Sequence, residues 1–331
     1  MKDMSKPDNE IEVEKLLNKM DNYRQTVGAI VALSHTLIRY YAADVRVGHP
    51  LKPSSQNRIQ NKDYVTPDIV SQGNDLNLIG EVKKSFPSDK TRWLQNIKQV
   101  EKYDDEFTNW INRDVKTHDV MLLTHYSHSN SVRTFVEEKI KNGEVKFERP
   151  LSIVEFVRNS ERNTYWGLRK IWGTISNKIL DGYITNDPIL INADDIVREL
   201  SSVWFYDATP EIPYTMSIMW NEIFPEKATP ERFRAAGGRG IIEMTITVDE
   251  ILEKCKTYFS SPDSYFPQKC WIVDAMDGLV KLGRAKKISG ETYTVSYHRI
   301  TGDPLQTLTK EWLSKSGDIR EYFKPEESKK D

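Results

Sequence analysis

The most constraining feature of this sequence is a predicted β-hairpin that carries three charged side chains. We predict paired strands over residues 64–70 and 76–83, because both runs are apolar and the Gln-Gly-Asn-Asp segment between them favours a turn. Side chains alternate along a strand, so Glu81 and Lys83 point the same way. Asp68 belongs to the partner strand. The hairpin therefore gathers two carboxylates and an amine in one small volume.

This combination of side chains suits the hydrolysis of a phosphodiester. Asp68 and Glu81 offer hard oxygen ligands of the kind that Mg²⁺ or Mn²⁺ prefers, and such an ion stabilises the charges that develop during the reaction. Lys83 would either deprotonate the attacking water or position it, and the first role requires a lowered pKa that the carboxylates oppose. Burying these charges in a half-buried strand is costly without a function. An exposed cross-strand ion pair is the alternative interpretation.

A predicted helix over residues 89–109 supplies further polar side chains. Ser88-Asp89 can cap its start, and Gln99 and Tyr103 share one helical face because they are four residues apart. Arg92 and Asn96 extend the same polar stripe along the helix. This stripe could hold phosphates or a base. The alternative is a polar face that is exposed to solvent. The candidate nucleic-acid-binding residues are Lys84, Arg92 and Asn96.

Three motifs in this order resemble those of the PD-(D/E)XK nuclease superfamily, particularly its RecB-like branch. They are Pro67-Asp68, Glu81-Val82-Lys83 and Gln99-x-x-x-Tyr103, within residues 25–125. The resemblance implies a restriction-endonuclease-like αβββαβ core, a divalent metal and phosphodiester cleavage. It assigns Asp68 and Glu81 as metal ligands and Lys83 as the catalytic lysine. Gln99 and Tyr103 would support the active site near the substrate.

The resemblance also draws attention to a histidine that precedes the hairpin. Members of this branch often carry a metal-binding histidine on the helix before the hairpin, and His35 occupies the matching place. His35 is also in phase with Val31 and Ile38, so a hydrogen-bonded core histidine is the alternative. Glu12 or Glu14 would replace it if the helix used an acidic ligand.

The rest of the chain predicts an α/β fold with a smaller α+β region at its C-terminus. The N-terminal part is expected to contain helices over residues 10–45 and 130–142, strands over 119–125 and 151–157, and a loop over 46–63. Pro67 lacks an N–H, which predicts an edge strand or a bulge at that point. A short helix is expected over residues 192–202, and another over 214–224.

The C-terminal region resembles a winged-helix module. Its predicted elements are a strand over residues 241–247, helices over 248–259 and 268–281, and a hairpin over 285–300 that turns at Ser289-Gly290. The helix over 268–281 would then read DNA. The predicted domains are a nuclease-like domain (1–175), a helical connecting region (176–240), the winged-helix-like domain (241–323) and a charged tail (324–331).

Composition narrows the class of protein. No apolar stretch among the 331 residues is long enough to cross a bilayer, and the polar start lacks the core of a signal peptide, so we expect a cytoplasmic protein without membrane association. The two cysteines, Cys255 and Cys270, favour buried free thiols over a disulfide and give no support to a zinc site. The formal net charge of −2 shows no bulk affinity for nucleic acid, although basic clusters occur locally.

The sequence therefore predicts a metal-dependent phosphodiesterase, a deoxyribonuclease with RNA as the alternative substrate. A role in prokaryotic or phage antiviral defence, restriction or repair fits such an enzyme. The C-terminal region would bind DNA or dock a protein partner. The alternative function is a non-catalytic subunit, in which a winged helix binds nucleic acid or protein beside a degenerate nuclease fold.

Overall fold

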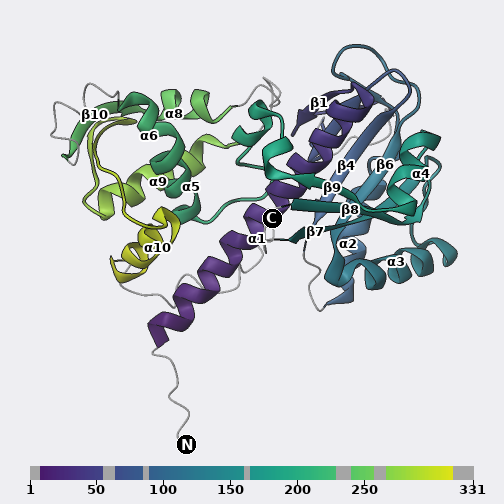
Figure 1. Cartoon of the computed structure of the whole chain (residues 1–331), viewed down its shortest axis with the longest axis horizontal. Helices are drawn as coiled ribbons and strands as arrows, with labels where there is room; N and C mark the ends of the chain where they lie inside the picture. Colours follow the sequence, from purple (N-terminus) through teal and green to yellow (C-terminus); the bar gives the residue numbers. More distant parts are fainter. Residues whose placement is uncertain are drawn as a thin grey trace, which may run out of the picture. The chain divides into compact units, whose positions relative to one another are not determined.

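The computed structural model describes residues 8–54, 64–84, 89–159, 165–228, 240–256 and 266–315. These fall into two compact units (Figure 1). The first unit comprises Met1–Tyr23, Thr209–Cys255 and Pro267–Asp331, and the second comprises Arg24–Ala208 and Lys256–Phe266. The predicted boundary at residue 175 therefore falls inside the second unit, because one helix and one sheet strand that follow this point belong to the same unit.

The second unit is built on a seven-stranded mixed sheet in the order β1-β3-β4-β6-β7-β8-β9. The central strands β4, β6 and β7 are parallel, and all other neighbours are antiparallel. Strand β6 is almost wholly buried, which explains its continuous apolar sequence. The strands are β1 (Asp44–Val47), β3 (Ile69–Gln72), β4 (Asn77–Lys83), β6 (Asp119–His125), β7 (Leu151–Asn159), β8 (Tyr165–Gly173) and β9 (Ile189–Asn192). A separate two-stranded pair joins β2 (Lys52–Pro53) to β5 (Phe107–Thr108).

Helices cover both faces of this sheet. On one face, α1 (Asp8–Tyr41) approaches so closely that a Cβ on Gly28 would overlap the ring of Trp166 in β8. Gly80 of β4 faces Leu33 of the same helix. The next residue of β4 must point to the opposite face, where α2 (Lys90–Glu101) and α3 (Tyr126–Lys141) lie together below the sheet in Figure 1. Helix α4 (Lys178–Asn186) packs against β8.

Several predicted elements are confirmed and others need correction. The hairpin forms, but β3 begins after Pro67 and pairs on both sides, so the prediction of an edge strand or a bulge there is wrong. The predicted loop over 46–63 contains part of β1 and all of β2. The helix predicted over 89–109 ends at Glu101, because Phe107 belongs to a β-strand, where it pairs with Pro53 of β2. These differences arise from long-range strand pairing, which local sequence patterns do not encode.

The segment after β9 is irregular. The helix predicted over residues 192–202 is replaced by two short 3₁₀ turns, η1 (Ala193–Asp195) and η2 (Arg198–Ser202). The helix predicted over 214–224 is confirmed in outline as α5 (Ile212–Ile218), continued by a π-helical turn η3 (Met219–Ile223) and α6 (Phe224–Lys227).

The first unit contains a three-stranded antiparallel sheet in the order β10-β12-β11. The predicted strand, helices and hairpin are confirmed here as elements. They are β10 (Ile242–Thr247), α8 (Val248–Cys255), α9 (Lys269–Lys281), β11 (Ala285–Ser289) and β12 (Thr292–Tyr297), followed by α10 (Pro304–Lys315). Helix α9 is central in this unit, since α5, α8 and β11 all pack against it.

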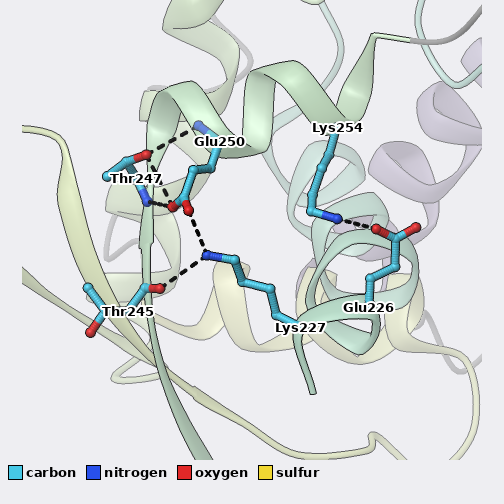
Figure 2. Close-up of polar contacts among 6 residues, drawn as sticks. All are labelled: Glu226, Lys227, Thr245, Thr247, Glu250 and Lys254. Atoms are coloured by element: carbon cyan, nitrogen blue, oxygen red, sulfur yellow. Dashed lines mark hydrogen bonds and ion pairs between the residues drawn. The ribbon is translucent and has the colours of Figure 1, made fainter. Parts of the chain in front are cut away.

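A capping box starts α8 and anchors α6 to it (Figure 2). The Thr247 backbone N–H donates to Glu250 Oε2 at 2.8 Å, and the Glu250 N–H donates back to Thr247 Oγ1 at 3.2 Å. Lys227 bridges this box to the sheet, since its amine bonds Glu250 Oε1 at 2.9 Å and the carbonyl of Thr245 at 3.3 Å. A second ion pair joins Lys254 to Glu226.

We expect Thr247→Ala to lower the free energy of unfolding by about 1 kcal/mol, because one backbone N–H of α8 loses its capping acceptor. Urea denaturation of the full chain measures this change. Thr307→Ala is the matched control, because the Thr307 hydroxyl donates to the carbonyl of Asp303, the residue before α10, and so acts in this bond as a donor and not as a capping acceptor. Equal stability of wild type and Thr247→Ala would contradict the role of the box.

Two predictions from composition can be compared with the structure. Among the described residues, no helix has both the length and the apolar character that a bilayer crossing requires. Both cysteines are free thiols, as predicted. Cys255 is buried, but Cys270 is exposed on α9, so the prediction that both are buried is wrong for Cys270.

Candidate active site

The hairpin places the two predicted carboxylates at adjacent positions of the sheet. Ile69 pairs with Gly80, so Asp68 lies one residue before this pair and Glu81 one residue after it. Both side chains have no exposed surface. The Val82 N–H donates to Asp68 Oδ2 at 2.8 Å, which fixes the Asp68 carboxyl against the backbone of β4. The predicted proximity of these groups is therefore present in the structure.

Glu81 is held by three side chains that donate to its carboxylate. The Lys83 amine lies 2.6 Å from Oε1, and Gln99 Nε2 donates to the same oxygen at 2.9 Å. The Tyr103 hydroxyl donates to Oε2 at 2.7 Å. The face of α2 and the turn after it thus meet the hairpin at Glu81. Gln99 and Tyr103 support this carboxylate directly, which gives the predicted pair a defined structural role.

Tyr103 lies beyond the end of α2, and a buried histidine fixes its backbone. His118 Nε2 donates to the Tyr103 carbonyl at 2.8 Å, and the His118 ring also contacts Phe107 and Trp110. Burial lowers the pKa of His118 to about 4, so the ring is neutral at physiological pH. No sequence motif pointed to this residue, because a histidine before an apolar strand carries no distinctive local signal.

Asp68 carries an unsatisfied oxygen. Its Oδ1 is buried and has no hydrogen-bond partner among the described residues, whereas Oδ2 accepts from Val82. Burial, followed by the negative charge of Glu81, raises the pKa of Asp68 well above its usual value. An orphaned carboxylate oxygen in the interior is costly, and a positively charged ligand would remove that cost.

The electrostatic environment keeps Lys83 protonated. Burial by itself would lower the pKa of Lys83, but the charges of Glu81, Asp68 and Asp207 outweigh it and raise the pKa above its usual value. Of the two roles considered for this lysine, the structure supports positioning and charge neutralisation over proton abstraction. The lysine side chain remains 19% exposed, so it can reach a ligand from the protein surface.

A third carboxylate approaches the site from a distant part of the chain. Asp207 follows η2 in the irregular segment that connects the sheet to α5. The residue as a whole is exposed, but its carboxyl is partly desolvated by its surroundings. This desolvation, followed by the negative charge of Glu81, raises the pKa of the Asp207 carboxyl to about 6. The neighbouring Tyr206 shares a hydrogen bond with Thr26 of α1. Asp207 could not be predicted from the sequence, because no motif connects it to the hairpin.

The predicted histidine ligand is not gathered with the two carboxylates. His35 is buried in α1, and its Nδ1 accepts a hydrogen bond from the Val197 N–H at 3.4 Å. Burial lowers the pKa of His35. The acidic substitutes Glu12 and Glu14 lie on the part of α1 that belongs to the other unit. Within the described ranges, no three histidine, cysteine, aspartate or glutamate side chains form a group that could hold a metal ion.

The candidate nucleic-acid contacts lie around the hairpin end. Arg92 is exposed on α2, and Asn96 is partly buried one turn further toward Gln99. Lys84 directly follows β4 and is partly buried. Burial, followed by the charge of Lys84, lowers the pKa of His125 at the end of β6, so Lys84 lies beside that neighbouring strand.

The site residues fit a hard divalent cation held in part by water. Two buried carboxylates stand side by side, and Asp68 Oδ1 lacks a partner among the described residues. Mg²⁺ commonly binds through one or two carboxylates and keeps several waters, so a third protein ligand is not required. The Lys83–Glu81 ion pair would have to lengthen to admit an ion on the Oε1 side.

Comparison with protein-family models, with curated proteins and with solved structures finds no match in any of the three. The functional interpretation therefore depends on the geometry of the site and on the motif resemblance.

Tyr103→Phe tests the support of Glu81. The substitution removes one donor from a buried carboxylate, so we expect the free energy of unfolding to fall by about 1–3 kcal/mol without divalent ions. Chemical denaturation measures the loss. Tyr126→Phe is the matched control, because the Tyr126 side chain is 54% exposed in the same unit. An equally small effect in both variants would mean that the Tyr103 hydroxyl does not stabilise Glu81.

Proposed function

We propose that this protein is a metal-dependent nuclease whose centre is formed by Asp68, Glu81 and Lys83. The observation that carries the proposal is the burial, beside a lysine, of two adjacent carboxylates, one of which has an oxygen without a hydrogen-bond partner in the described part of the chain. A structure without such a function would gain stability from apolar side chains at these positions. The arrangement of the hairpin and α2 also supports the resemblance to PD-(D/E)XK nucleases of the RecB-like branch.

Each residue has a defined task in this proposal. Asp68 and Glu81 would hold Mg²⁺ or Mn²⁺, which supplies Lewis-acid stabilisation of the charge on a phosphate. Lys83 would orient the attacking water and offset negative charge on the scissile phosphate. Gln99 and Tyr103 would keep the Glu81 carboxylate in one orientation. The preferred substrate is DNA, with RNA as the alternative, and Lys84, Arg92 and Asn96 would contact its backbone.

A cleavage assay tests the proposal. Supercoiled, linear and single-stranded DNA and an RNA of matched length are incubated with the full chain, with Mg²⁺ or Mn²⁺ titrated in. We expect cleavage that requires the cation and is lost in Glu81→Gln, which keeps the shape of the side chain but not its charge. Equal cleavage by wild type and Glu81→Gln would assign the activity to a different centre.

The C-terminal elements are compatible with a winged-helix-like module, but the surface of α9 favours protein docking over DNA reading. The exposed face of α9 carries Asp274 and Asp277 as well as Lys269 and Lys281. Asp277 also binds the Tyr293 hydroxyl at 2.8 Å, so it has a structural role in this unit. Carboxylates on a reading helix would repel the phosphates of DNA. This observation supports the second candidate function, an assembly subunit that contacts protein through its C-terminal region.

A further inference from the structure

Helix α4 and strand β9 lie at one end of the seven-stranded sheet order (Figure 1). A groove opens beside them and carries several large apolar side chains. Strand β9 ends the sheet order and, within the described ranges, pairs only with β8. A cavity of about 610 Å³ opens beside it. Its lining includes Tyr40 at the end of α1, Ile179 and Tyr183 on α4, and Leu190 on β9. All of these residues belong to the second unit.

The groove is lined by large apolar side chains that are exposed to solvent, which is energetically unfavourable. Ile179 is 76% exposed, and Tyr183, Leu190 and Tyr40 are each more than half exposed. Ile179 and Tyr183 are one turn apart and so lie on the same face of α4. Single exposed apolar residues are ordinary, but four around one groove mark an interaction surface.

Among the described strands, β9 has a pairing partner on one side alone, β8. Its sequence, Ile-Leu-Ile-Asn, contains no charged residue, and Pro188 stands just before its start. Ile189 and Ile191 are buried while Leu190 is exposed, so a strand added at this edge would cover Leu190. The outward N–H and C=O groups of an edge strand are a template for pairing with another chain. The pairing length is short, about 14 Å for four residues.

The charges around β9 identify the kind of chain that fits. Asp187 lies before the strand, and Asp194 and Asp195 lie after it, all exposed. A second copy paired antiparallel through β9, with the two-fold axis between Leu190 and Ile191, would place Asp187 opposite Asp194 of that copy. Like charges opposite each other destabilise a strand pair. The same carboxylates repel the phosphates of a nucleic acid, so both of these occupants are disfavoured.

We propose that β9 and its groove bind an extended segment of a partner protein, which adds to the sheet as an eighth strand. The segment has apolar side chains at alternate positions, which enter the groove, and Lys or Arg at both ends, which face the exposed carboxylates. Backbone hydrogen bonds would supply affinity, and the groove would supply specificity. This inference is independent of the nuclease proposal, because it uses none of the same residues.

A peptide-binding measurement on the full chain tests the inference. The probe is a fluorescent peptide, Lys-Lys-Val-Thr-Val-Thr-Val-Lys-Lys, followed by anisotropy. We expect saturable binding that weakens by about tenfold in Tyr183→Ala or Leu190→Ala, as removal of a central apolar anchor does. Ile288→Ala is the matched control, because Ile288 is 57% exposed in the other unit, and this variant keeps wild-type affinity. Asp187→Lys should also weaken binding, and added salt should weaken it further.

Four control measurements decide between occupants. A peptide with Glu in place of Lys, and one with Pro at alternate positions, should bind at least about tenfold more weakly if charge and backbone pairing both contribute. The inference is overturned if the Lys peptide does not bind, or binds Tyr183→Ala and Leu190→Ala as well as wild type. It is also overturned if sedimentation shows a dimer that these variants abolish, or if an oligothymidylate binds the groove instead.

Discussion

Lys83→Ala should reduce cation-dependent cleavage by about 10²–10⁴-fold, the range expected for loss of a positioned proton-transfer or charge-stabilising group. The same change removes the amine 2.6 Å from the buried Glu81 carboxylate, so the free energy of unfolding should fall by about 3 kcal/mol. Single-turnover cleavage of labelled DNA measures the rate, and chemical denaturation measures the stability. Lys83→Arg keeps the charge and should restore most of the stability but not the full rate, because the guanidinium cannot occupy the same position.

Lys170→Ala separates the two effects of Lys83→Ala. Lys170 lies in β8, its side chain is 8% exposed, and it forms an ion pair with Asp181 of α4. This substitution should destabilise the protein to a similar degree and leave the cleavage rate per folded molecule unchanged. If Lys170→Ala and Lys83→Ala reduced the cleavage rate per folded molecule equally, Lys83 would contribute only to folding and not to catalysis.

Asp68→Asn should make the cation-free protein more stable at pH 8, by about 1.4 kcal/mol for each unit by which the pKa of Asp68 is raised. The folded-state pKa is above the unfolded value of about 3.9, so the folded wild type binds the proton more tightly than the unfolded chain does. Wild-type stability therefore falls as pH rises from about 4 through the raised pKa, and Asn abolishes this loss. Thermal unfolding between pH 4 and 8 measures the slope.

Added Mg²⁺ should make the wild type more stable than Asp68→Asn at pH 8, the reverse of the order expected without the cation. The cation neutralises the carboxyl pair in the wild type, so its unfolding temperature should rise with Mg²⁺ at pH 8, whereas that of Asp68→Asn should not. Asp119→Asn is the control, because both oxygens of this buried aspartate already accept hydrogen bonds from Ser176. That variant should keep the wild-type response to Mg²⁺. A Mg²⁺ response in Asp68→Asn equal to that of the wild type would place the cation elsewhere.

The hairpin and the start of α2 could be predicted, because the residues that define them are close together in the sequence. The hairpin followed from two apolar runs around a turn, and the start of α2 followed from the capping capacity of Ser88-Asp89. Of this pair, Asp89 is the cap, and its side chain accepts from the Thr91 N–H at 2.8 Å. These signals are local, so they appear in the sequence without knowledge of the tertiary fold. The same is true of α9 and of the hairpin β11–β12, which were predicted almost to the residue.

The part that depends on distant segments could not be predicted. Strand β9 extends the sheet beyond the expected domain boundary at residue 175, because it pairs with β8, which precedes that boundary. Asp207 approaches Glu81 only because the segment after η2 returns to the hairpin. Of the two interpretations of His35, the structure agrees with the hydrogen-bonded core histidine, since the residue is buried and its ring accepts from the Val197 N–H. Its helical phase indicated burial, but it could not identify Val197 as the partner.

Titration of the metal-free chain with Mn²⁺, followed by electron paramagnetic resonance of the free ion, tests the central claim most directly because it needs no knowledge of the substrate. We expect saturable Mn²⁺ binding to wild type and to Asp119→Asn, competition by Mg²⁺, and loss of that binding in Asp68→Asn. Mn²⁺ binding of undiminished affinity in Asp68→Asn, or none in the wild type, would contradict a cation site at the hairpin and with it the proposed nuclease centre.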